Sequence, residues 1–165
     1  MTAPKPTSRA RARHAGPADA PALTALVREA YSHYVPLLGG EPGPMGQDQA
    51  AVIRRGDVTV LDDDGLLVGV IVLTVGEEGF LVENVAVHPA RRGRGHGAWL
   101  LRYAEDQALS RGFDSLYLYT HRAMTENQQL YARLGYRTYD ERTVDGAPLV
   151  FMRKHLARLQ AAEPE

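Results

Sequence analysis

Apolar and polar positions follow two different periods along the chain, and each change of period marks an expected element. Residues 8–15 alternate in the way of a short strand near a sheet edge. Asp19 is placed to cap a helix. The helix after it has one apolar face, made by Leu23, Leu26, Val27, Ala30, Tyr31 and Tyr34. Glycines and prolines in 35–46 predict a loop, and a second short helix is expected near 47–55.

The rest of the chain reads as strands and two further helices. Two β-rich runs in 57–75 flank Asp64-Gly65, a dipeptide that favours a hairpin turn. The remaining strands are expected over 79–87, 114–121, 136–143 and 147–154, and helices over 95–112 and 125–135. Thr125 and Gln128 have the spacing of a capping box. The order β-α-α-β-β-β-α-β-α-β-β predicts a mixed α+β fold around one sheet.

Length and composition narrow the class of protein. The chain of 165 residues suits one domain over 8–155, with tails at 1–7 and 156–165. A net charge of -1 argues against a nucleic-acid partner. The absence of cysteine excludes disulfides and thiol nucleophiles, and no spacing of side chains suggests a metal. No apolar run approaches a membrane span, and the first residues lack a secretory signal, so a cytoplasmic location without a membrane partner is expected.

A glycine-rich turn between an apolar strand and an apolar helix carries the strongest chemical signal. Residues 91–97 read Arg-Arg-Gly-Arg-Gly-His-Gly. Helix starts leave backbone N–H groups unpaired, and glycine lets an anion approach them closely. A phosphate cradle is one interpretation, and a tight turn with solvated arginines is another. A dinucleotide-binding turn is disfavoured, because the glycine spacing differs and no acid ends the next strand.

The segment around Arg92, Gly93, Gly95 and Gly97 resembles the R-x-x-G-x-G acetyl-CoA motif of the GNAT superfamily of N-acetyltransferases. The preceding strand "ENVAVHP", the helix "TENQQLYARLGY" and the order of elements from about residue 8 to 154 are also similar to that family, close to uncharacterised bacterial members. The resemblance implies a sheet of about seven strands with about four helices. It also implies acetyl-CoA as cosubstrate.

The resemblance assigns cosubstrate contacts to three groups of residues. Turn amides would hold the pyrophosphate, strand main chain would pair with the pantetheine arm, and two helix side chains would reach the thioester. These residues are Val85, Ala86, Val87, Arg92, Gly93, Arg94, Gly95, His96, Gly97, Ala98, Asn127 and Tyr131. Tyr131 would protonate the departing thiolate. The alternative is that Leu130, Tyr131 and Leu134 form a core stripe.

Glu83 lies inside an apolar strand, where a carboxylate is costly unless it is paired or faces a wet cleft. In the direct-transfer mechanism that the resemblance implies, Glu83 would take the proton of the attacking amine, itself or through water. The alternative is an ion pair with a nearby arginine. Val85 and Val87 have the parity of Glu83 along the strand and are expected on the same face.

The sequence defines the expected binding site for the acetyl acceptor less clearly. In the resembled fold it is built from the first two helices and their connection, which offer Tyr31 and Tyr34, while His121 ends a neighbouring strand. A small-molecule amine is the expected acceptor, although a non-catalytic acyl-CoA-binding or sensor module of the same fold remains an alternative. A homodimer is compatible with the resemblance, but no segment marks its surface.

Overall fold

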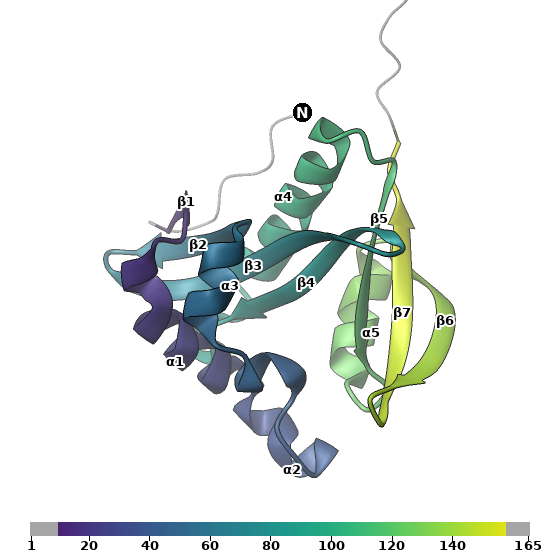
Figure 1. Ribbon diagram of the computed structural model, residues 1–165, viewed down its shortest axis with the longest axis horizontal. Coiled ribbons are helices and arrows are strands. Elements are labelled where there is room, and N and C mark those ends of the chain that lie inside the picture. The colour runs from purple at the N-terminus through teal and green to yellow at the C-terminus, as the bar shows by residue number, and fades with distance from the viewer. Residues whose placement is uncertain (1–9, 158–165) are drawn as a thin grey trace, which may run out of the picture.

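The computed structural model describes residues 10–157 and contains one seven-stranded sheet with helices on both faces (Figure 1). The predicted tail 1–7 and all but the start of the tail 156–165 lie outside the described residues. The elements are β1 (Arg11–His14), α1 (Ala20–Tyr31), α2 (Val35–Leu38), α3 (Gln49–Arg55), β2 (Val58–Asp63), β3 (Leu66–Gly76), β4 (Gly79–Val87), α4 (His96–Ser110), β5 (Ser115–His121), α5 (Thr125–Arg133), β6 (Arg137–Val144) and β7 (Ala147–His155). The predicted α+β class is confirmed, with α2 as an addition.

The sheet is split in its middle. Its order is β1-β2-β3-β4-β5-β7-β6, and only the contact between β4 and β5 is parallel. That contact consists of two residue pairs, Phe80 with Leu116 and Leu81 with Tyr117. Beyond them the two strands diverge, and Figure 1 shows the sheet opening as a V. Residues 82–87 and 118–121 therefore turn unpaired strand edges toward each other.

Helices cover both faces of the sheet, and each face has its own hydrophobic core. On one face, Leu100, Leu101 and Ala104 of α4 pack with β-strand residues and with Tyr131 of α5. On the other face, α1 and α3 bury Leu23, Val27 and other apolar residues against β2, β3 and β4. The apolar stripe predicted for the first helix is thus confirmed for Leu23, Leu26, Val27 and Ala30, whereas Tyr34 lies beyond α1 in a 3-10 turn over Ser32–Tyr34. These two layers fix β4 and α5 on either side of the open part of the sheet.

The turn chemistry explains where several elements end. Asp64 and Gly65 both have positive φ, 51° and 91°, as the predicted hairpin turn requires. Gly112 and Gly135 follow α4 and α5 with φ of 85° and 97°, which suits glycine after a helix.

Two local predictions were wrong. The segment expected as a loop contains α2 and a short 3-10 turn over Gly43–Gly46, because Pro36 and Pro44 stand at first-turn positions where their fixed φ suits a helix. Thr125 is the first residue of α5 rather than its cap, and Met124 occupies the cap position without a side-chain bond. Gln128 instead donates to the carbonyls of His121 and Arg122.

A β-bulge in β4 determines the direction of Glu83. Val72 pairs with Asn84 and Leu73 pairs with Val82, so Glu83 is the extra residue between them. Val85 packs toward the core beneath α4, whereas the Glu83 carboxylate binds Arg55 of α3, on the other face. The predicted common face of Glu83 and the two valines is therefore wrong, because the bulge interrupts the alternation.

Candidate active site

Two pockets meet in the open part of the sheet. The smaller, here called the glycine-turn cleft, has a volume of about 410 Å³ and lies between the start of α4, the end of β4 and α5. The larger, here called the large pocket, has a volume of about 660 Å³ and lies between the α2–α3 segment, β4, β5 and the β6–β7 turn. Both are lined by the same four residues, Tyr31, Val85, Asn127 and Tyr131. These residues form the junction of the two pockets.

The glycine-turn cleft brings together nearly all of the predicted cosubstrate residues. Its lining includes every one of them except Arg94, namely Val85, Ala86, Val87, Arg92, Gly93, Gly95, His96, Gly97, Ala98, Asn127 and Tyr131. Gly93 and Gly95 have φ of 78° and 83°. A Cβ built on Gly93 would meet nothing within 4 Å. The backbone here is therefore open to a ligand.

The start of α4 supplies hydrogen-bond donors to this cleft. Gly95 is the N-cap, and its carbonyl accepts the first helical bond, from the Trp99 N–H at 3.0 Å. The N–H groups of His96, Gly97 and Ala98 precede that bond and have no acceptor within the helix. Together with the partial positive charge of the helix start, they form a binding site suited to phosphate.

Arginines anchor the turn to the elements around it. Arg92 donates to the Ala30 carbonyl at the end of α1, at 2.8 Å. Arg91 forms an ion pair with Asp63 of β2. The alternative of solvated arginines is therefore wrong for these two residues. His96, 2% exposed, has no hydrogen-bond partner for either ring nitrogen within the described residues, and burial together with Arg94 and Arg91 lowers its pKa.

Tyrosine side chains surround the junction. The Tyr31 hydroxyl donates to Asn84 Oδ1 at 2.6 Å and lies 3.2 Å from the Val85 carbonyl oxygen. Tyr34 donates to Asn127 Oδ1 at 3.2 Å; it lines the glycine-turn cleft and not the large pocket, contrary to its expected place at the acceptor end. Tyr131 is 7% exposed, and burial raises its pKa well above the ordinary value. Its hydroxyl therefore stays protonated at neutral pH.

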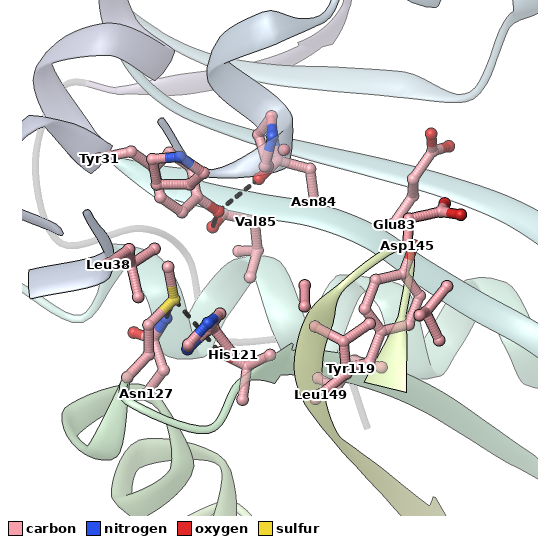
Figure 2. Close-up of a pocket in the computed structure, with 18 of the residues that line it drawn as sticks. Tyr31, Leu38, Glu83, Asn84, Val85, Tyr119, His121, Asn127, Asp145 and Leu149 are labelled. Atoms are coloured by element: carbon pink, nitrogen blue, oxygen red, sulfur yellow. Dashed lines mark hydrogen bonds between the residues drawn. The ribbon is translucent and has the colours of Figure 1, made fainter. Parts of the chain in front are cut away.

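Glu83 lines the large pocket (Figure 2), and it also forms an ion pair with Arg55. Arg55 Nη2 lies 3.1 Å from Glu83 Oε1, and the arginine side chain is 56% exposed. The second carboxylate oxygen, Oε2, is not used by this bond. Both sequence-based interpretations of Glu83, a structural ion pair and a group facing a cleft, thus describe part of its environment.

In both His121 and His88, one ring nitrogen accepts a hydrogen bond from a backbone N–H. His121 lines the large pocket, and its Nδ1 accepts the Ala123 N–H at 3.0 Å. The proton of the neutral imidazole is then on Nε2, so His121 offers the pocket a donor rather than a base. His88 Nδ1 similarly accepts the Ala90 N–H, a bond that orders the start of the turn.

Several lining residues were missed at the level of sequence. Asn84 is buried and binds Tyr31, Met124 contacts the Asn127 amide, and Asp145 lies in the β6–β7 turn. Asn84 carries a usable signal, because a polar residue in an apolar strand requires a partner. Within residues 10–157 no cluster of three metal-binding side chains occurs, and no helix there is long and apolar enough to cross a membrane.

Comparison with known proteins identifies the family. The family model for the GNAT acetyltransferase domain matches residues 54–138, just over half of the chain. The protein therefore belongs to the GNAT acetyltransferase family. The matched segment contains the glycine turn, Glu83 and Tyr131. No curated protein matches the sequence significantly.

Solved structures with this fold come from several organisms. The PaiA N-acetyltransferase of Thermoplasma acidophilum, solved with coenzyme A, has 20% identity and a TM-score of 0.74, covering 90% of this chain and 99% of that one. The putative acetyltransferase YncA of Salmonella typhimurium, solved with acetyl-CoA, has 22% identity and a TM-score of 0.67, covering 94% and 99%. The ribosomal-protein-S18-alanine N-acetyltransferase of Escherichia coli has 18% identity and a TM-score of 0.71, covering 94% and 99%.

Proposed function

We propose that the protein transfers the acetyl group of acetyl-CoA directly to a primary amine of a small molecule. The observation that carries this proposal is the junction of two pockets at Tyr131, one with a phosphate-binding turn and the other with free volume for an acceptor. Acetyl-CoA supplies the activated acetyl group as a thioester. The large pocket has the size of a small-molecule site.

The glycine-turn cleft fits the proposed cosubstrate. The free N–H groups at the start of α4 would bind its pyrophosphate, and glycine at positions 93, 95 and 97 keeps side chains out of the way. The unpaired edge of β4 at Val85–Val87 offers main-chain groups to an extended arm that contains amides. This route ends at Asn127 and Tyr131, which lie one helical turn apart on α5.

Tyr131 is proposed as the general acid. When the amine nitrogen bonds to the thioester carbonyl carbon, the carbon–sulfur bond breaks and the electron pair leaves on sulfur. The Tyr131 hydroxyl gives its proton to that sulfur. The raised pKa of Tyr131 keeps its hydroxyl in the protonated, donating form at neutral pH, so the proton is present when the thiolate departs.

Glu83 is proposed as the general base that accepts the proton lost by the amine, itself or through a water. Its place in the large pocket supports this role, and the bulge directs its side chain away from the core beneath α4. Arg55 holds one carboxylate oxygen and so restricts the other to fewer orientations.

Calorimetric titration with acetyl-CoA tests the proposed function first. We expect micromolar affinity for acetyl-CoA and none for NAD or ATP, because the turn lacks the features of dinucleotide and P-loop sites. Amines are then screened by release of the CoA thiol. Failure of acetyl-CoA to bind would refute the proposal. Tight binding without thiol release from any amine would favour a non-catalytic acyl-CoA-binding or sensor module.

Glu83→Gln is expected to lower kcat by about 100-fold, within the range for loss of a general base, while acetyl-CoA affinity stays the same. The matched control is Arg55→Gln, which removes the ion pair but leaves the carboxylate. A kcat for Arg55→Gln close to wild type would assign the loss to proton transfer. Equal losses in both variants would mean that Glu83 acts only through its ion pair with Arg55 and not as a base.

A further inference from the structure

A buried histidine ring lies where the glycine turn (residues 91–97) joins α4, and the proposed reaction does not use it. His96 is the first residue of α4 and is 2% exposed. Neither of its ring nitrogens has a hydrogen-bond partner within residues 10–157. A neutral imidazole carries one N–H donor and one acceptor nitrogen, and here both are unpaired. Buried polar groups in native proteins almost always have a partner, so this ring is exceptional.

The position of His96 in α4 directs its ring toward the hydrophobic core. His96 shares a helical face with Trp99 and Leu100, which follow it by three and four residues. Leu100 is fully buried in the core between α4 and the sheet, and Trp99 packs against that core. Trp99 Nε1 is also buried without a partner among the described residues. The surroundings of the ring are therefore apolar.

The charged groups around the ring oppose a positive charge on it. Arg94 and Arg91 act on His96 electrostatically, as does Asp63 of β2, but Asp63 already forms an ion pair with Arg91. The start of α4 adds its own partial positive charge. In β3, β4 and β5, which pack against α4, the only lysine, arginine or carboxylate is Glu83, and that carboxylate is turned to the other face of the sheet.

A proton on His96 would thus create a buried cation without an acceptor. The closed turn therefore favours the neutral ring, and burial together with the two arginines lowers the pKa of His96. When the start of α4 opens, water solvates the ring and its pKa returns to about 6.5. Below that pH the open form binds more protons than the closed form, so acid favours opening. Above about pH 7 the closed turn keeps its full stability.

We propose that His96 makes the glycine turn acid-sensitive: in mild acid its ring leaves the core, and the start of α4 opens locally. The N–H groups that the closed turn presents to phosphate then lose their arrangement. This consequence for acetyl-CoA rests on the proposed function. The opening itself is a property of the ligand-free protein and does not depend on what the turn binds.

His88 is a second histidine near this turn that gains a proton in acid. Its Nδ1 accepts the Ala90 N–H, and its Nε2 lies 2.7 Å from Glu29 Oε2 of α1. Protonation would break the first contact and strengthen the second. His88→Asn is therefore the matched control, because asparagine also accepts a backbone N–H from this capping position but does not titrate.

Hydrogen exchange of the Trp99 amide in ligand-free protein tests the proposal. The Trp99 N–H donates to Gly95, the first hydrogen bond of α4, so its exchange reports opening of the helix start. Its protection factor is the intrinsic exchange rate at each pH divided by the observed rate. From pH 7.5 to 5.5 we expect this factor to fall about 10-fold, as for a ring that is neutral when closed and has an ordinary pKa when open.

Two variants remove the titrating ring in different ways. His96→Leu gives an apolar side chain and His96→Asn a neutral polar one, so the second keeps the test valid if leucine disturbs the core. In both, the Trp99 protection factor should change less than about 2-fold between the two pH values, because neither side chain titrates there. His88→Asn should show the same fall as the wild type.

Three results would overturn the proposal. They are an unchanged wild-type protection factor, a fall of the wild-type size in both His96 variants, and loss of the fall in His88→Asn. Equal protection of Trp99 and of the buried Ile71 in β3 would overturn the local opening, because α4 would then open only when the whole protein unfolds. Failure of acetyl-CoA to bind would refute the proposed function but would leave this test unaffected, since it uses no ligand.

Discussion

Gly95→Glu is expected to weaken acetyl-CoA binding at least about 100-fold, because it places a carboxylate within the turn proposed to bind phosphate. Gly95 has φ of 83° and caps α4, so any side chain there adds strain of about 1 kcal/mol or more. The larger effect is electrostatic. The new carboxylate would compete for the same N–H groups that the pyrophosphate needs. Calorimetry with acetyl-CoA measures the change.

Gly65→Glu separates that effect from general damage to the fold. Gly65 has φ of 91°, a Cβ there would meet nothing within 4 Å, and the residue lines neither pocket. Gly65→Glu therefore adds the same charge as Gly95→Glu and a similar backbone strain, but at a turn remote from the glycine-turn cleft. Wild-type affinity in Gly65→Glu with lost affinity in Gly95→Glu is the expected pair of results. Unchanged affinity in Gly95→Glu would rule out the turn as the phosphate site.

Tyr131→Phe is expected to lower kcat about 100-fold while the acetyl-CoA Kd stays within about 3-fold. The phenyl ring keeps the buried packing and the edge-on contact with Tyr136, whose ring centroid lies 6.0 Å away. Only the hydroxyl is lost, and with it the proposed proton donor to sulfur. Steady-state rates of thiol release, together with calorimetry, separate catalysis from binding.

The neighbouring Tyr136 provides the control for Tyr131. Its hydroxyl is buried without a hydrogen-bond partner among the described residues, and its side chain lines neither pocket. Tyr136→Phe should therefore keep the wild-type rate, because it removes a buried hydroxyl of the same kind that faces no substrate. A normal rate in Tyr131→Phe would instead mean that water or another residue protonates the thiolate.

The sequence predicted the parts of the site that depend on local chain geometry. Gly93 and Gly95 adopt the positive φ that glycine makes accessible, and the turn precedes a helix start as expected. Asn127 and Tyr131 share a helical face because their spacing fixes it. These features depend only on residues that are close together in the sequence, so the sequence alone determines them.

Other parts depend on contacts between distant segments and were missed or misjudged. The side chain of Glu83 changes face because of a bulge, which appears only in the pairing of β3 with β4. Asp145 reaches the pocket because β7 inserts between β5 and β6 and places their turn near the open edge. Neither the strand order nor the bulge leaves a periodic signal, so alternation alone could not reveal them.

The split between β4 and β5 also bears on how the protein avoids aggregation. A free strand edge normally invites pairing with another chain. Here the unpaired edges of residues 82–87 and 118–121 face each other within one sheet, and they converge at the Phe80–Leu116 pair. A foreign strand would need to enter a narrowing space between two edges that are already fixed on their outer sides by β3 and β7. The protein can thus keep main-chain groups available to a narrow ligand while excluding another β-strand.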